Sequence, residues 1–181
     1  MKQTVRGVLG LLSLGVVLAG NPLRAAEGDL KVGDPAPAFK LEGTDGKVYA
    51  LDDFKGKKGV VLAWFPKADT PGCTIECKSL REHGAALKPL KIAYFTASVD
   101  QPEANKKFAE KLGLDYPILS DPDKSVAKAY GVVHAKRAVA ERWTFYIGKD
   151  GTIKAIDKKI STKTAGSDVA EKAKELGITG E

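Results

Sequence analysis

Short apolar runs alternate with longer segments of mixed polarity along residues 60–131. The first run, "VVLAWF" at 60–65, is β-branched and uncharged, which is typical of a strand buried on both faces of a sheet. By such patterns we expect strands at 60–65, 91–100 and 116–121, and helices at 73–86, 101–113 and 123–131. Strands that alternate with helices favour an α/β architecture.

Two predicted hairpins flank the alternating region. The segment 39–51 has a turn at "TDGK", and the segment 142–156 turns around Lys149-Asp150-Gly151. A last helix is expected at 165–177. This order predicts an α/β protein of the thioredoxin-like fold, with a mixed central sheet flanked by helices and 39–51 as an N-terminal β-hairpin extension.

The first 25 residues have the layout of a secretory signal peptide. Lys2 and Arg6 precede an uncharged apolar run, residues 7–20, which is short for a membrane span and is followed by small residues. We therefore predict that residues 1–25 are removed on export, leaving 26–181 as a single domain in the periplasm or outside the cell. Cleavage after Ala26 instead, and an uncleaved N-terminal anchor helix, stay open as alternatives.

The charge balance argues against a nucleic-acid partner. Without Lys2, Arg6 and Arg24, the net charge falls from +6 to about +3. The remaining charges are interspersed, whereas nucleic-acid binding needs a clustered basic face. We expect no nucleic-acid partner and no stable membrane association after processing.

Cys73 and Cys77 are the two cysteines of the chain. Their spacing is one residue too long for a C-x-x-C redox motif, and no second Cys or His pair completes a zinc site. Cys73 falls in the first turn of its predicted helix, where unpaired N–H groups and the helix dipole stabilise a thiolate. Thr70 supplies a hydroxyl three residues earlier, and Pro66 and Pro71 stiffen the loop. Position alone favours Cys73 as the nucleophile.

The pattern Pro66-x-x-x-Thr70-x-x-Cys73 matches the active-site pattern of the peroxiredoxins, and the wider "FPKADTPGCT" resembles the peroxiredoxin Q group, also called bacterioferritin comigratory proteins. These are thioredoxin-like domains of the AhpC/TSA type. Three further segments, 32–41, 120–132 and 142–151, fall where that family places similar ones. The resemblance therefore covers the domain from near residue 32 to the final helix.

The resemblance implies thiol-based peroxide reduction with no metal or organic cofactor. Cys73 would be the peroxidatic cysteine, Thr70 would hydrogen-bond the thiolate and the peroxide, and Pro66 would shield the site from water. Arg142 matches the family's active-site arginine, whose charge stabilises negative charge across the O–O bond. Glu76 lies one turn below Cys73 and could orient Arg142, although an exposed helix position is equally compatible with the sequence.

The family also implies a substrate and a partner. The substrate would be hydrogen peroxide or a small organic hydroperoxide, and an external thioredoxin-like or other thiol donor would re-reduce the enzyme. We expect a monomer or a weak dimer.

The chain departs from the family at the resolving cysteine, which often lies five residues after the peroxidatic one. Lys78 occupies that position here, and the second thiol is Cys77. Cβ atoms four residues apart in a helix are about 5–6 Å apart, whereas a disulfide needs roughly 3.5–4.5 Å. We favour Cys77 as the resolving cysteine, through local unwinding of the helix. A buried bystander on the face shared with Cys73 stays open.

Other functional classes share this fold. The Sco copper-binding proteins use C-x-x-x-C thiolates and a later histidine, but Ala140 stands where that histidine is expected and His134 lies six residues earlier. A thiol–disulfide oxidoreductase would need C-x-x-C and a later cis-proline, and no proline follows Pro122. A non-catalytic binding domain would leave the groups around Cys73 unexplained.

Overall fold

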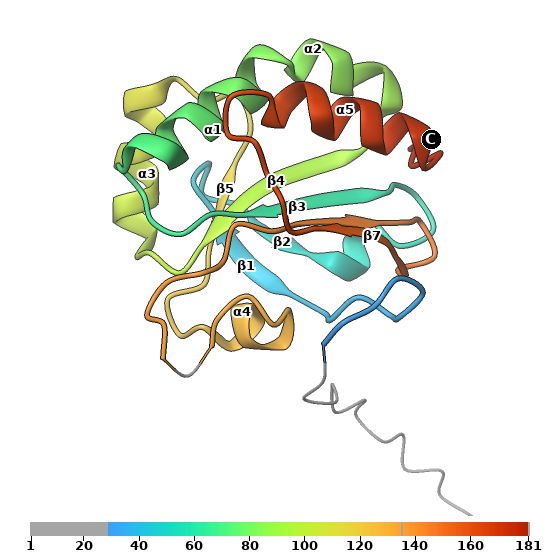
Figure 1. Cartoon of the computed structure of the whole chain (residues 1–181), viewed down its shortest axis with the longest axis horizontal. Coiled ribbons are helices and arrows are strands. Elements are labelled where there is room, and N and C mark those ends of the chain that lie inside the picture. The colour runs from blue at the N-terminus through green and yellow to red at the C-terminus, as the bar shows by residue number, and fades with distance from the viewer. Residues whose placement is uncertain (1–28, 135, 181) are drawn as a thin grey trace, which may run out of the picture.

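The computed structural model describes residues 29–134 and 136–180 (Figure 1). The predicted signal peptide, residues 1–25, and both candidate cleavage positions lie outside the described residues. Within the described part of the chain, no helix is long and apolar enough to cross a membrane.

The described residues form one mixed sheet of seven strands in the order β2-β1-β5-β4-β3-β6-β7. The strands are β1 (Lys40–Gly43), β2 (Val48–Ala50), β3 (Val60–Trp64), β4 (Ala93–Ser98), β5 (Ile118–Ser120), β6 (Thr144–Ile147) and β7 (Ile153–Asp157). The helices are α1 (Pro71–Glu82), α2 (Gly84–Leu87), α3 (Pro102–Leu112), α4 (Ser125–Ala129) and α5 (Ala165–Glu175), with short 3-10 turns at Leu51–Asp53 and Lys88–Leu90.

The centre of the sheet is parallel and its two edges are antiparallel. Strands β3, β4 and β5 pair in parallel, as expected for strands joined by helices. The β1–β2 hairpin adds antiparallel to β5, and the β6–β7 hairpin adds antiparallel to β3. Both predicted hairpins and the thioredoxin-like mixed sheet are thus confirmed.

Helices cover both faces of the sheet, which explains the uninterrupted apolar run in β3. Figure 1 shows α1, α2 and α5 above the sheet and α4 below it. Val61 and Ala63 share a buried cluster with residues of α1 and α5, whereas Val60, Leu62 and Trp64 share another with α4. All five β3 side chains are therefore removed from water, and alternation between polar and apolar residues is absent.

The single helix predicted at 73–86 was wrong at both ends. Helix α1 begins two residues earlier, with Pro71 as its first residue, and ends at Glu82. The chain then bends at His83, and Gly84 starts the separate helix α2. A side chain at Gly84 would place a Cβ 3.1 Å from the Tyr94 hydroxyl. This close packing of α2 onto the sheet depends on tertiary contacts.

Candidate active site

The loop between β3 and α1 carries Pro66 and Thr70, and the partly buried carboxylate of Asp100 holds it. The backbone N–H of Ala68 donates to the Asp100 carboxylate at 2.8 Å. Asp100 follows β4, which is parallel to β3, so the two strands end at the same edge of the sheet. Asp69 adopts a left-handed conformation, with φ of 60°, which Asp tolerates better than most residues.

A hydrogen-bond network extends from Asp100 into the protein. The Ser98 hydroxyl donates to Asp100 at 2.9 Å and is also bonded to the Asn105 amide, which in turn donates to Ser120. Ser98, Asn105 and Ser120 are all buried. The network ties β4, α3 and β5 to the loop and fixes the approach to α1.

Helix α1 places Cys73 at an N-terminus with free donors. Thr70 is the N-cap and Pro71 the first helical residue, so Cys73 is the third. The first N–H groups of a helix have no acceptor within it, and since Pro71 has no N–H, those of Gly72 and Cys73 remain. These two donors and the helix dipole favour negative charge beside the Cys73 sulfur.

Thr70 caps α1 through its backbone alone. Its hydroxyl donates to the Lys67 carbonyl at 3.0 Å, and the side chain makes no capping hydrogen bond. The oxygen lone pairs stay available to accept a hydrogen bond from a peroxide O–H. Pro66 is half-buried on the same loop.

Arg142 links the thiol to a buried carboxylate. Its Nη2 lies 3.4 Å from Cys73 Sγ, and its Nη1 donates to the Glu76 carboxylate. Arg142 arrives from just before β6, where the neighbouring backbone is fixed by the Trp64 N–H donating to the Trp143 carbonyl at 2.8 Å. The sequence allowed Glu76 either to orient Arg142 or to be an exposed helix residue. The second interpretation is wrong, since Glu76 is 1% exposed.

Burial dominates the electrostatics of Glu76. It raises the pKa of the Glu76 carboxyl from 4.5 to about 7, although the positive charge and hydrogen bond of Arg142 act in the opposite direction. The Arg142 guanidinium does not lose its proton in this way, because arginine stays charged in proteins. Arg142 is thus a cation held between a titrating carboxyl and a thiol.

Cys77 is buried, as Cys73 is, and lies on the same helix face. It is fully buried in a cluster with Phe65, Phe108 and Ile118, between α1, α3 and the sheet. Burial raises the pKa of the Cys77 thiol to about 12, and the nearby charge of Glu76 adds to this. Both cysteines are free thiols in this structure. The predicted shared face is confirmed, and Cys77 needs a change of conformation to meet Cys73.

The arrangement suits nucleophilic chemistry better than metal binding. In the described part of the chain, no group of three His, Cys, Asp or Glu side chains is placed to hold a metal ion. The positive charge of Arg142 lies beside Cys73 and would repel a copper ion at that sulfur. His134 packs edge-on against the Trp143 ring, with centroids 6.4 Å apart.

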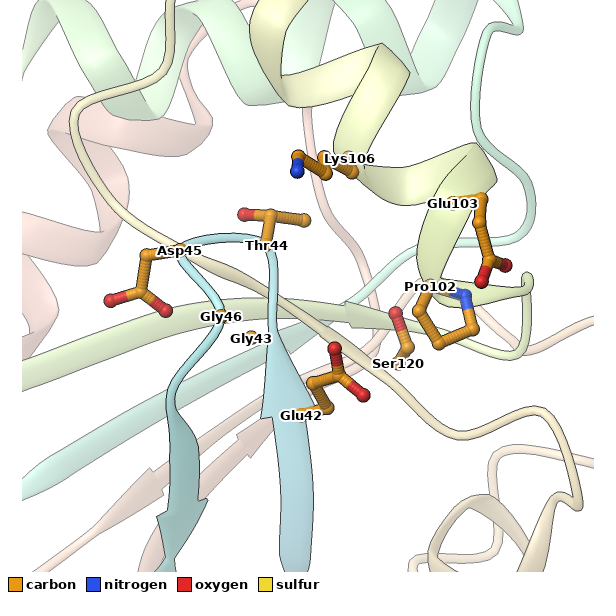
Figure 2. Close-up of a pocket in the computed structure, with 9 residues that line it drawn as sticks. All are labelled: Glu42, Gly43, Thr44, Asp45, Gly46, Pro102, Glu103, Lys106 and Ser120. Atoms are coloured by element: carbon orange, nitrogen blue, oxygen red, sulfur yellow. The ribbon is translucent and has the colours of Figure 1, made fainter.

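 The pocket in Figure 2, of about 450 Å³, lies between the β1–β2 turn and the start of α3. It is lined by residues 42–46, by Pro102, Glu103 and Lys106, and by Ser120. No predicted site residue lines it, and it meets the hydrogen-bond network of the loop only at Ser120.

Sequence reasoning missed several residues that shape the site. Asp100 could have been found, because it ends the predicted strand 91–100, the next strand after the one that leads into the active-site loop. Tyr116, whose hydroxyl donates to the Cys77 carbonyl at 2.9 Å, carries no local signal, since the two residues are 39 positions apart. The approach of Arg142 and Thr162 to Gly72 likewise depends on tertiary structure.

Known proteins resemble this chain over most of the described domain. The model of the AhpC/TSA family matches residues 32–156. The chain is 37% identical over 137 residues to a putative peroxiredoxin bcp of Coxiella burnetii, covering 72% of this chain and 90% of that protein. It is 38% identical over 133 residues to peroxiredoxin Bcp of Escherichia coli K12, covering 70% and 85%.

Solved structures share the fold. Peroxidoxin BcpB of Mycobacterium tuberculosis superposes with a TM-score of 0.73 at 27% identity, covering 81% of this chain and 97% of that one. A cysteine-to-serine mutant of PrxQ from Xylella fastidiosa gives a TM-score of 0.75 at 23% identity, with coverage of 82% and 98%. By sequence and by fold, the chain belongs to the AhpC/TSA family, among the peroxiredoxins of the Bcp group.

Proposed function

We propose that Cys73 carries out the thiol-dependent peroxidase activity that membership of the peroxiredoxins gives this chain. The Cys73 thiolate attacks one peroxide oxygen, so that an S–O bond forms as the O–O bond breaks. Sulfur loses two electrons and becomes sulfenic acid, while the departing oxygen takes up a proton and leaves as water or an alcohol. The substrate is hydrogen peroxide or a small organic hydroperoxide.

The observation that carries this proposal is the position of Arg142 between Glu76 and Cys73. One guanidinium nitrogen is engaged by the carboxylate and the other lies 3.4 Å from the sulfur. Charge that develops on the peroxide oxygens beside Cys73 therefore meets a fixed cation and the free N–H groups of α1. Thr70 accepts a hydrogen bond from the peroxide and orients it, and Pro66 limits the access of water.

We further propose that Cys77 resolves the sulfenic acid. Its thiol displaces the sulfenic oxygen as water, which leaves a Cys73–Cys77 disulfide. Several contacts hold the second half of α1: the Ser79 hydroxyl donates to the Lys163 carbonyl, the Gly166 N–H donates to Ser79, and Tyr116 donates to the Cys77 carbonyl. Unwinding of the first turn therefore brings Cys73 to Cys77. An external thioredoxin-like or other thiol donor then reduces the disulfide.

Intact-mass analysis after one equivalent of hydrogen peroxide tests both roles, with the reduced wild type, Cys73→Ser and Cys77→Ser compared in the presence of a chelator. The proposal predicts that the wild type loses two hydrogens, that Cys77→Ser gains one oxygen, and that Cys73→Ser stays unmodified. A stable gain of one oxygen in the wild type would overturn the role of Cys77 and leave a one-cysteine enzyme. No rapid change in any protein would overturn the role of Cys73.

We also propose that the protein is exported and works in the periplasm or outside the cell. The basic start and the apolar run at 7–20 support this address. Expression of the full chain in a Gram-negative host, followed by fractionation and N-terminal sequencing, tests it. A processed chain that begins near residue 26 in the periplasmic fraction is expected. An intact Met1 in the cytoplasmic fraction would contradict the proposal.

A further inference from the structure

Gly72 occupies a position in helix α1 at which glycine is unfavourable for helix formation. It is the second residue of α1, and its backbone is not among the left-handed glycines of the described residues. Glycine is a poor helix former, since it loses more backbone freedom than other residues. Neither the backbone conformation nor helix stability explains its presence directly before Cys73.

The space left by the missing side chain faces Arg142. A Cβ at Gly72 would lie 3.3 Å from Arg142 Nη2 and 4.0 Å from Thr162 Cγ2. Nη2 is the nitrogen that lies 3.4 Å from Cys73 Sγ. A side chain at position 72 would therefore press on the same atom that contacts the reactive sulfur.

The Arg142 guanidinium cannot move away from position 72 without disturbing its other contacts. Its Nη1 donates to Glu76, which is 1% exposed and is carried by the same helix as Gly72. Thr162 lies on the side of Gly72 toward which an added methyl group would point. A displacement of Arg142 of a few tenths of an ångström must be taken up by its contact with Cys73 or by its bond to Glu76.

We propose that Gly72 is a positioning residue, whose missing side chain lets Arg142 reach Cys73 and Glu76 at the same time. The inference rests on the proposed function of Cys73, because it concerns the reactivity of that thiol. It explains why glycine occupies a helical position with an ordinary backbone conformation.

A graded series tests the proposal. Gly72→Ala and Gly72→Val add one and three carbon atoms beside Arg142, and Lys78→Val is the matched control on an exposed position of α1. We expect the second-order rate constant for Cys73 oxidation by hydrogen peroxide to fall about tenfold for Ala and about a hundredfold for Val, because misplacement of a catalytic group by up to 1 Å has effects of this size. Lys78→Val should keep the wild-type rate.

Thermal unfolding separates positioning from a structural role. Alanine is the better helix former, so the melting temperature of Gly72→Ala should equal or exceed that of the wild type while its rate falls. In an Arg142→Ala background, Gly72→Val should cause no further loss of rate, because the group it displaces is gone. A wild-type rate for Gly72→Val, or an equal loss with and without Arg142, would overturn the proposal.

A second readout distinguishes failure of this inference from failure of the proposed function. In the Cys77→Ser background, the alkylation rate of Cys73 by iodoacetamide reports thiolate reactivity without any peroxide. Slower alkylation of the Gly72→Val variant supports the positioning role even if the wild type does not react with peroxide. Unchanged alkylation combined with rapid peroxide reaction in the wild type would overturn the role of Gly72 and leave that of Cys73 intact.

Discussion

Replacement of Glu76 by glutamine is expected to remove a pH-dependent cost of folding. In the native protein, burial raises the pKa of the Glu76 carboxyl from 4.5 to about 7, against the opposing effect of Arg142. Between these two pH values the folded state holds a proton that the unfolded state has released. Stability therefore falls as the pH rises through this window, and the loss is complete above about pH 7.

The size of the effect follows from the shift. A rise of the Glu76 pKa from 4.5 to about 7 lowers the free energy of unfolding by about 3 kcal/mol between pH 4.5 and pH 8. Glutamine keeps an oxygen acceptor for Arg142 and does not ionise. The free energy of unfolding of Glu76→Gln, relative to the wild type, should thus rise by about 3 kcal/mol from pH 4.5 to pH 8.

Urea unfolding of the reduced proteins at several pH values between 4.5 and 8.5 measures this difference. Glu82→Gln serves as the control, because Glu82 lies on the same helix with its side chain 60% exposed. The control should follow the wild-type pH dependence. Parallel curves for the wild type and Glu76→Gln would refute the reasoning, since they would mean that Arg142 keeps Glu76 ionised throughout.

Two further predictions concern the rate and the packing around the site. Arg142→Ala should lower the rate constant for Cys73 oxidation about 10²- to 10³-fold in stopped-flow experiments, as loss of a preorganised donor does elsewhere, and a change of less than about threefold would count against it. Gly166→Ala should destabilise the fold by about 2 kcal/mol or more, because its Cβ would lie 2.1 Å from the Ser79 carbonyl oxygen where α5 meets α1. An unchanged urea midpoint for Gly166→Ala would contradict that packing.

Local patterns predicted the order of elements well. The continuous apolar run of β3 reflects burial on both faces, and the two hairpins follow from their turn residues. Helix α3 begins at Pro102 and is followed by the left-handed Gly113, in agreement with the expected helix from 101 to 113. The break between α1 and α2 escaped prediction, since it depends on how closely Gly84 approaches Tyr94.

The candidate site also contains residues that local sequence patterns could select and residues that depend on distant contacts. Cys73 and Thr70 are close in sequence, so the start of a helix after a strand was enough to select them. Arg142 lies 69 positions from Cys73, and only the resemblance to a family pointed to it. The burial of Glu76 could not be predicted, because its helix position is compatible with solvent until Arg142 is placed beside it.

The rate at which Cys73 reacts with peroxide tests the central claim most directly. Reduced protein is mixed with hydrogen peroxide, quenched with an alkylating agent at successive times, and the sulfenic acid or disulfide at Cys73 is quantified by mass. The account predicts a second-order rate constant at least about a hundredfold above that of free cysteine at the same pH, because Arg142 and the start of α1 stabilise the transition state. A rate equal to that of free cysteine would contradict it.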